Sequence, residues 1–387
     1  MKTYRILITG GAGFIGSHLA YRLLESGHEV SILDSLVPQV HPYQPQKPSY
    51  LDPRAKFVRG DVLDSKIISK LITEAEIVVH FAARVGVAQS MYMISDFISN
   101  NTLGTANLLE NLVQKENSVQ KLIVASTMSV YGEGAYQCKN CGIVYPPSRK
   151  RSDIIINTSK KIGYHWEPKC PICNGPVHPI PTPENAELNP TTVYAHSKLH
   201  QEQLSLLIGK TNGLPVTALR FFGTYGSHQA LSNPYTGVCA IFATSLLAGN
   251  SPIIYEDGAQ SRDLVHVSDV CQAVELSLDN PQSKGEVFNV GTGERVTIIE
   301  IANRLQNLLK VRVPNQISNQ FRAGDVRHIF ADIAKIKNKL GYQPKMMFNQ
   351  GIEEFVDWIR EIQDKKLVNI SDRAQEAFNQ LKRYNLL

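Results

Sequence analysis

The sequence predicts an α/β protein with three parts: a doubly wound parallel sheet, a smaller α/β domain after it, and a four-cysteine segment inserted into the first part. Three observations support this prediction. Apolar runs alternate with helical patterns from Arg5 onward, a glycine-rich turn follows the first of these runs, and two pairs of closely spaced cysteines interrupt the alternation. Strands that alternate with helices are typical of parallel sheets covered on both faces.

The composition is that of a globular protein, because 43% of the residues are hydrophobic and 19% are charged. No apolar run reaches the roughly 18 residues of a membrane-spanning helix, and the N-terminus enters a strand pattern without an apolar leader. We therefore expect a cytoplasmic protein with no membrane partner. The net charge of +5 is small for this length, and the basic residues are scattered apart from those at 148–151, so no nucleic-acid partner is expected.

The first strand–helix–strand unit, from Arg5 to Asp34, carries a dinucleotide fingerprint. Glycines without side chains let the backbone approach a pyrophosphate, which the helix N-terminus attracts. The residues expected to form this cradle are Gly10, Gly13, Phe14, Ile15 and Gly16. Asp34 ends the second strand, where a carboxylate accepts hydrogen bonds from the adenosine ribose and repels a 2′-phosphate, so NAD is favoured over NADP. The alternative is a glycine turn that binds no ligand.

Three further parallel strands are predicted at 56–61, 77–83 and 121–127. Ligands of such sheets bind at the carboxyl ends of the strands. The residues at these ends are Asp61 with the adjoining Val62, Ala82, Ala83 and Thr127, which we expect near the cofactor. For Asp61 the alternative is a helix or turn cap.

A helix is predicted to start at Asn189–Pro190 and to carry Tyr194 and Lys198. Residues four apart share one face of a helix. An ammonium near a tyrosine favours the phenolate, which lowers the tyrosine pKa toward neutral and makes it a general acid/base. This spacing is weak evidence alone, but it is strong after a dinucleotide fingerprint and a strand that ends in a hydroxyl residue.

With these residues the sequence resembles the extended short-chain dehydrogenase/reductase family, in the branch of nucleotide-sugar epimerases and dehydratases. The segments "TGGAGFIG", "NTLGT", "STMSVYG", "YAHSK" and "RAGDVRHIFAD" occur in the family's order over nearly the whole chain. The resemblance implies that Thr127 completes a catalytic set with Tyr194 and Lys198. It also implies that Asn101 and Phe222 line the cofactor pocket, and that the substrate is bound by Ser90, Thr127, Asn233, Arg262, Arg322 and Asp325.

Two departures from the family pattern bear on the reaction. Dehydratases of the family carry Asp-Glu directly after the catalytic threonine, and decarboxylating relatives usually have Glu at the second place, whereas this chain has Met128 and Ser129. Neither residue supplies an acid and base at neutral pH, so an epimerase or a simple 4-reductase is favoured. Gly223 and Ser227 replace the family's usual Asn and Pro, which puts the substrate contacts of that loop in doubt.

Residues 133–188 form an insertion relative to the family pattern, rich in proline and cysteine. Two C-x-x-C pairs, each near a glycine, predict a closed structural zinc site made of Cys138, Cys141, Cys170 and Cys173. Disulfides are disfavoured in a reducing compartment. His165 and His178 are alternative ligands, and Cys239 and Cys271 are expected in the core. Because the insertion joins Thr127 to the helix of Tyr194, we expect it beside the active site, as a lid or an oligomer contact.

The insertion and the segment "LSNPYTGV" together resemble a narrower group, the dTDP-L-rhamnose 4-epimerase type. The function expected is NAD-dependent 4-epimerisation of a nucleotide sugar, such as a dTDP-6-deoxyhexose. The alternatives are a 4-keto-sugar nucleotide reductase, a UDP-hexose 4-epimerase and a non-catalytic NAD-sensing regulator. We expect a homodimer, with an NAD-binding Rossmann domain at 1–215 that contains the insertion and a mainly sugar-nucleotide-binding domain at 216–387.

Overall fold

The computed structural model describes residues 2–41, 47–157, 162–231, 233, 235–322, 324–363, 379–380, 382–384 and 386. Its centre is a seven-stranded sheet in the order β16-β11-β5-β4-β1-β2-β3, in which every pair of neighbours is parallel. The strands are β1 (Arg5–Thr9), β2 (Glu29–Asp34), β3 (Lys56–Arg59), β4 (Ile77–His80), β5 (Lys121–Thr127), β11 (Val216–Phe221) and β16 (Glu286–Val290). The direction in which successive strands are added to the sheet reverses between β1 and β4, as in the Rossmann fold. Ligands of such folds bind in the crevice at the carboxyl ends of these two strands.

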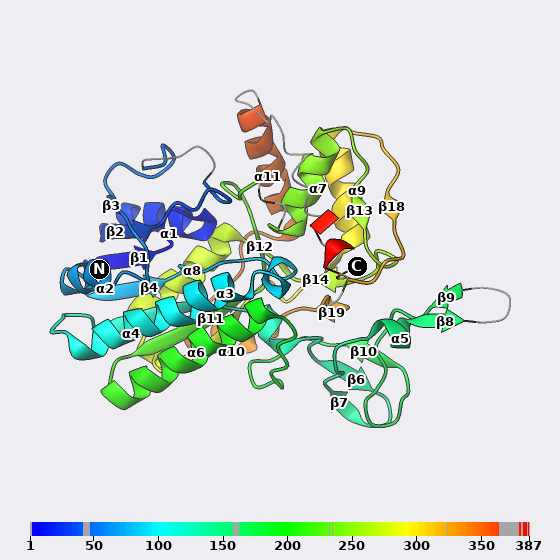
Figure 1. The fold of residues 1–387 in the computed structure, drawn as a ribbon, viewed down its shortest axis with the longest axis horizontal. Helices are drawn as coiled ribbons and strands as arrows, with labels where there is room; N and C mark the ends of the chain where they lie inside the picture. Colours follow the sequence, from blue (N-terminus) through cyan, green and yellow to red (C-terminus); the bar gives the residue numbers. More distant parts are fainter. Residues whose placement is uncertain are drawn as a thin grey trace.

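Helices cover both faces of the sheet (Figure 1). One face packs on α1 (Phe14–Glu25), α8 (Val267–Leu278) and α10 (Ala334–Leu340), and the other on α2 (Ser65–Thr73), α4 (Gly104–Gln114) and α6 (Val193–Asn212). Short helical turns link these elements: η1 (Gln89–Met91), α3 (Ile94–Phe97), η2 (Ile98–Leu103), η3 (Met128–Tyr131) and η4 (Pro281–Ser283). The prediction of a doubly wound parallel sheet is therefore confirmed.

Helix α6 begins three residues later than the sequence indicated. Its N-cap is Thr192, whose hydroxyl accepts a hydrogen bond from Ala195 N at 3.2 Å. Asn189 instead donates its backbone N–H to Val130 O at 2.9 Å, which ties the preceding chain to the end of β5. The tertiary contact thus overrides the helix-start signal of Asn-Pro.

A second hydrophobic core lies beside the carboxyl end of the sheet and joins α7 (Val238–Leu247), α9 (Ile298–Leu309) and α11 (Phe348–Gln363). Short strands surround it: β12 (Gly223–Tyr225) pairs with β15 (Leu264–His266), and β13 (Ile253–Ile254) pairs with β18 (Gln316–Ile317). A third set joins β14 (Ser261–Arg262) to β17 (Val296–Thr297) and β19 (His328–Ile329). Residues after 215 therefore supply both this smaller core and two strands of the large sheet.

The insertion forms a small separate body at the lower right of Figure 1. Its sheet has the order β10-β6-β7, with β6 (Tyr136–Cys138), β7 (Gly142–Val144) and β10 (Val177–Pro179). Beyond it lie α5 (Arg151–Ile154) and the pair β8 (Ile155–Asn157) and β9 (Ile162–Tyr164). We call residues 133–188 the ribbon below.

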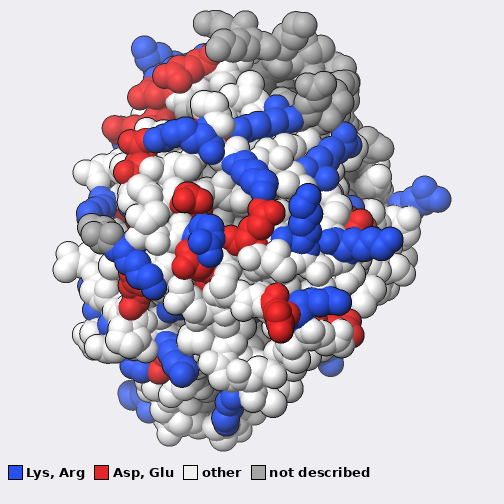
Figure 2. Space-filling model, turned by 90° about the vertical axis from the view of Figure 1, so that its left-hand side faces the viewer, with Lys and Arg blue, Asp and Glu red and all other residues white. Residues whose placement is uncertain are grey.

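Among the described residues, no helix is both long and apolar enough to cross a membrane. On the face shown in Figure 2, lysines and arginines lie between acidic side chains. Of the two cysteines outside the ribbon, Cys239 lies in α7 and Cys271 in α8, and both are buried as expected.

Candidate active site

The glycine-rich turn after β1 forms a cradle at the N-terminus of α1. Gly10 has a φ of +70°, and a Cβ there would lie 2.7 Å from Ala82 N, so only glycine lets the turn meet the loop after β4. No side chain caps α1, and its first turn holds no acidic residue, so its first N–H groups face the cradle. These features fit a pyrophosphate, and the turn with Phe14, Ile15 and Gly16 would hold it.

Asp34 lies beside this cradle, at the end of β2. It is 8% exposed, and its carboxylate accepts hydrogen bonds from Ala12 N at 3.0 Å and Leu36 N at 2.9 Å, one on each oxygen. Each oxygen keeps a second lone pair for a ribose hydroxyl. The position and the remaining acceptors suit the adenosine ribose of NAD.

The loops after β3 and β4 hold the other residues predicted to contact the cofactor. Asp61 accepts a hydrogen bond from Leu63 N at 2.9 Å and so caps a turn, while Val62 is buried. Asn101 is fully buried, and its amide binds Arg84 N, Arg84 O and Ser197 Oγ. It therefore fixes the loop of Ala82 and Ala83 to α6, and its place in the cofactor pocket stays a prediction.

Thr127, Tyr194 and Lys198 meet where β5 ends and α6 begins. The Thr127 side chain neighbours the phenol of Tyr194, and both residues are buried. Burial raises the pKa of Tyr194 to about 12, and the interaction with Thr127 only partly offsets this. Burial lowers the pKa of Lys198 to about 7. The structure thus places Thr127 beside Tyr194, with Lys198 buried one turn further along α6, and the catalytic role of the three residues stays a prediction.

The expectation that Lys198 lowers the pKa of Tyr194 is not met in this structure. The Lys198 ammonium donates to Gln201 Oε1 at 2.5 Å, one helical turn further along α6. Gln201 Nε2 binds Thr105 Oγ1 at 2.7 Å and His80 Nε2 at 3.2 Å, so a buried polar chain lies behind the lysine. Burial, aided by the Lys198 charge, lowers the pKa of His80 to about 3, so this imidazole is neutral. Sequence reasoning missed the chain because its members come from three separate elements.

Ser90 has a structural role at the start of α6, and its contact with substrate stays a prediction. It is fully buried; its hydroxyl donates to Val87 O at 2.7 Å and accepts from Tyr194 N at 3.0 Å. It therefore anchors the start of α6. Phe222 is also buried, directly after β11, where its ring lies 6.5 Å from that of Tyr131.

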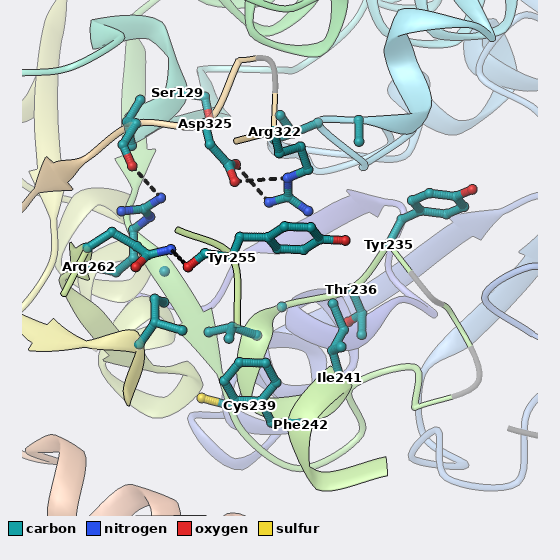
Figure 3. A pocket seen from close by; sticks show the side chains of 18 of the residues that line it. Ser129, Tyr235, Thr236, Cys239, Ile241, Phe242, Tyr255, Arg262, Arg322 and Asp325 are labelled. Atoms are coloured by element: carbon teal, nitrogen blue, oxygen red, sulfur yellow. Dashed lines mark hydrogen bonds and ion pairs between the residues drawn. The ribbon is translucent and has the colours of Figure 1, made fainter. Parts of the chain in front are cut away.

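A cavity of about 400 Å³ opens between the large sheet and the smaller core (Figure 3). Met128 and Ser129, which follow Thr127, line it on one side, and Thr191 and Thr192 line it near Tyr194. Its remaining polar and aromatic lining includes Asn233, Tyr235, Tyr255, Arg262, Arg322 and Asp325. The substrate residues predicted from the second half of the chain therefore converge here. Sequence reasoning missed Tyr255, because an isolated tyrosine carries no motif, and it quoted Tyr235 only within the segment "LSNPYTGV".

Two arginines give the cavity its positive charge. Arg322 forms a two-pronged ion pair with Asp325, at 2.9 and 2.7 Å, and lies 5.2 Å from the ring centre of Tyr255. Arg262 donates to the backbone oxygens of Ser261, Val326 and Arg327, and it makes no ion pair within the part of the chain that the structure describes. A guanidinium without a carboxylate partner suits a bound phosphate.

The four ribbon cysteines cluster as their spacing predicted. Their sulfur atoms all lie within 4.8 Å of one another, and Cys138 Sγ lies 3.6 Å from Cys173 Sγ. A tetrahedron of thiolates around zinc, at about 2.3 Å each, has edges of about 3.8 Å, so the cluster fits that ion. Among the described residues, neither His165 nor His178 belongs to this group.

Comparison with known proteins supports the chemistry of the site. Residues 6–151 match the NAD dependent epimerase/dehydratase family, and residues 173–355 match the GDP-mannose 4,6 dehydratase family. A dTDP-L-rhamnose 4-epimerase of Burkholderia thailandensis is 32% identical over 94% of this chain and 96% of its own length. A putative UDP-glucose 4-epimerase of Methanocaldococcus jannaschii is 30% identical over 92% of this chain and 98% of its own.

Solved structures agree with this assignment. A UDP-glucose 4-epimerase of Thermotoga maritima with UDP-glucose has a TM-score of 0.74 at 28% identity and covers 93% of this chain and 99% of its own. A UDP-glucuronic acid 4-epimerase of Bacillus cereus, in complex with UDP-glucuronic acid and NAD, has a TM-score of 0.73 at 25% identity. The match covers 92% of this chain and 99% of the Bacillus chain.

Proposed function

Because this chain belongs to the NAD dependent epimerase/dehydratase family, we propose that it inverts carbon 4 of a nucleotide sugar, and that its substrate is a dTDP-6-deoxyhexose such as dTDP-L-rhamnose. The observation that carries the proposal is the presence of Met128 and Ser129 in the cavity wall beside Thr127. A thioether and a neutral hydroxyl do not supply the acid and base that loss of water requires. The 32% identity with a dTDP-L-rhamnose 4-epimerase supports the choice of substrate.

In this proposal Tyr194 acts as the phenolate, so its pKa of about 12 must fall when cofactor and substrate bind; the phenolate takes the proton of the C4 hydroxyl and later returns it. Thr127, beside the same phenol, would hold the sugar hydroxyl in line. NAD, when bound beside Gly10 and Asp34, would accept the hydride of C4 and return it, so it would be unchanged after each turnover. Between the two transfers the 4-keto sugar presents its other face, which inverts C4.

The cavity would hold the nucleotide part of the substrate. Arg262 and Arg322 would bind the two phosphates, and the ring of Tyr255 offers an apolar surface for the base. Asp325, next to Arg322, would accept hydrogen bonds from the ribose. Arginine forks match phosphate oxygens in geometry as well as in charge.

The four ribbon cysteines would hold one zinc ion. Four thiolates leave no open position for water, so the ion would stabilise the ribbon and take no part in the reaction. Backbone N–H groups of Cys173 and Ile172 point to the Cys170 sulfur, and together with the neighbouring thiols they outweigh burial and lower its pKa to about 7. Free thiols of this kind fit a reducing compartment such as the cytoplasm.

A homodimer is the second part of the proposal. Helices η2, α4 and α6 lie side by side and expose large apolar side chains, namely Ile98 and Leu103 on η2 and Leu207 on α6. An apolar face shared by adjacent helices suits a second copy of the same chain, packed about a two-fold axis. Light scattering on the purified protein tests this, and Leu103→Glu with Leu207→Glu should yield monomers.

A substrate panel tests the enzymatic proposal. Purified protein is incubated with dTDP- and UDP-sugars without added NAD, and the products are identified by NMR. We expect a dTDP-6-deoxyhexose to be converted to its C4 epimer, and Tyr194→Phe serves as the matched inactive control. A product that has lost water would contradict epimerisation. Turnover only with added NADH would show a reductase, turnover of UDP-hexoses alone would change the substrate, and no turnover would favour an NAD-binding regulator.

A further inference from the structure

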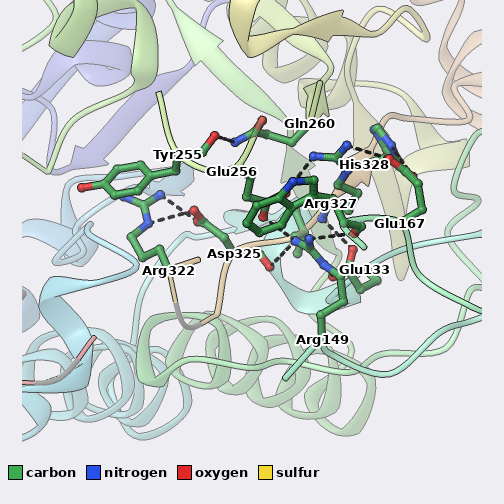
Figure 4. Close-up of polar contacts among 12 residues, drawn as sticks. Glu133, Arg149, Glu167, Tyr255, Glu256, Gln260, Arg322, Asp325, Arg327 and His328 are labelled. Atoms are coloured by element: carbon green, nitrogen blue, oxygen red, sulfur yellow. Dashed lines mark hydrogen bonds and ion pairs between the residues drawn. The ribbon is translucent and has the colours of Figure 1, made fainter. Parts of the chain in front are cut away.

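A buried ion network joins the ribbon to the smaller core (Figure 4). It places two arginines among four carboxylates: Glu133, Arg149 and Glu167 come from the ribbon, and Glu256, Asp257 and Arg327 come from the chain beyond residue 215. Arg149 is 8% exposed, and Glu133, Glu256 and Arg327 are 1% exposed. Buried charges need close partners, because each loses its hydration. The network therefore fixes the geometry of the groups that it connects.

Arg149 uses its whole guanidinium in this network. It donates to Glu133 Oε1 at 2.8 Å and Glu256 Oε1 at 2.9 Å, and to the backbone oxygens of Trp166 at 3.1 Å and Asp325 at 3.2 Å. Burial acts to lower the pKa of Arg149, but Glu133 and Glu256 outweigh it and raise that pKa above its usual value. Arg149 is therefore a charged residue of the ribbon that hydrogen-bonds the backbone of Asp325, a residue of the cavity wall.

The segment 324–327 is held from two sides. On the ribbon side, Arg149 binds Asp325 O, and Glu133 Oε2 accepts a hydrogen bond from Arg327 N at 2.6 Å. On the cavity side, Arg262 donates to Val326 O at 2.7 Å and Arg327 O at 3.1 Å. The ribbon and a cavity arginine thus clamp the same stretch of backbone.

This segment shapes both the cavity and the catalytic helix. Its Asp325 forms the ion pair with Arg322 in the cavity wall. Its Gly324 lies against Thr192, the N-cap of α6, since a Cβ at Gly324 would lie 2.8 Å from Thr192 Cγ2. No described residue of the ribbon lines the cavity itself, so the ribbon acts on it through this segment and not as a lid.

We propose that Arg149 and Glu133 are positioning residues for nucleotide binding: they hold segment 324–327 so that Arg322 and Asp325 face the substrate. The inference rests on the proposed function, because it takes the cavity to bind a nucleoside diphosphate sugar. It gives the ribbon a role in substrate affinity that its distance from the reacting atoms does not suggest.

Isothermal titration of the NAD-bound enzyme with dTDP and with UDP tests the proposal. Arg149→Met removes the guanidinium group and nearly keeps the length of the side chain. Whichever nucleotide binds, its Kd should rise by between about 5-fold and 150-fold. The NAD content should not change, since Gly10 and Asp34 lie in another part of the fold. Arg22→Met is the control: it makes the same chemical change at an arginine that binds both carboxylate oxygens of Glu275, between α1 and α8, and it should leave the Kd unaltered.

A double-mutant cycle separates positioning from general stability. If Arg149 acts through Arg322, then Arg149→Met should cost little further affinity in an Arg322→Ala background. Additive effects, or an unchanged Kd in folded Arg149→Met protein, would overturn the inference. If Arg149→Met does not fold, Glu133→Gln gives the same comparison with a smaller change in volume. Wild-type enzyme that binds neither dTDP nor UDP would instead overturn the proposed function, and the inference with it.

Discussion

Replacing Cys170 with serine should release the metal and unfold the ribbon while the Rossmann sheet stays folded. Cys170 is one of the four sulfur atoms that lie within 4.8 Å of one another, and it is 2% exposed. Zinc is held by thiolates, and a serine hydroxyl is not ionised at neutral pH and ligates it poorly. Three remaining thiolates would leave an open, weaker site.

The size of the effect is estimated for the small sheet around the cysteines, which belongs to the ribbon but not to the ion network of Glu133 and Arg149. Apart from cysteines, its hydrophobic cluster buries Tyr136, Val144 and Val177, which contribute roughly 5–9 kcal/mol in total at about 1.5–3 kcal/mol each. The strands β6, β7 and β10 have three residues each, and ordering these nine backbones costs about 9–18 kcal/mol. A structural zinc ion supplies about 10–16 kcal/mol, so we expect this small sheet to depend on the metal.

The assay combines metal analysis, limited proteolysis and NAD retention. Wild-type protein should contain about one zinc per chain and resist cleavage between 133 and 188. Cys170→Ser should lose the zinc and be cut there, yet keep its NAD after gel filtration. Cys271→Ser is the matched control, because it makes the same chemical change at a buried cysteine of α8 outside the cluster. A metal-free wild type with a protected ribbon would refute the reasoning, as would Cys170→Ser protein that keeps its zinc.

Three other predictions concern the active site. Tyr194→Phe keeps the edge-on packing with Phe97 but removes the proton carrier, so turnover should fall by about 10²- to 10⁴-fold; a rate within tenfold of wild type would contradict its role. Asp34→Ala should weaken NAD and improve NADP in binding titrations, because it removes the charge that repels a 2′-phosphate, and a wild type that already prefers NADP would exclude this reading. The pKa of Lys198 is about 7 in the folded protein and 10.5 ordinarily. Between pH 7 and pH 10.5 the unfolded chain therefore binds more protons than the folded one. The free energy of unfolding of the NAD-free enzyme should rise by a few kcal/mol across this pH range. Urea unfolding at pH 7 and pH 10 should show a smaller rise for Lys198→Met, and an equal rise would count against the buried, uncharged lysine.

The local patterns of the sequence were sufficient for the framework and for most of the site. The glycine turn at Gly10, the acid at Asp34 and the order of strands and helices depend on neighbours in the chain, so they can be read without the fold. The same holds for Cys138 and Cys170, because a C-x-x-C pair places two sulfurs on one turn, and the two turns then meet in the structure. Such features are encoded over a few residues by backbone conformation and apolar periodicity.

Only the tertiary structure decided which polar groups meet. Glu133 and Arg327 are 194 residues apart, yet the Glu133 carboxylate accepts the Arg327 N–H at 2.6 Å in the clamp beside the cavity. Likewise, Ser90 hydrogen-bonds the start of α6, although the family resemblance pointed to the substrate. Lys198 hydrogen-bonds Gln201, although its spacing pointed to Tyr194. A buried polar side chain must satisfy its hydrogen bonds with whatever packing brings within reach. Motif spacing determines where a functional group sits along the chain, and packing determines what it touches.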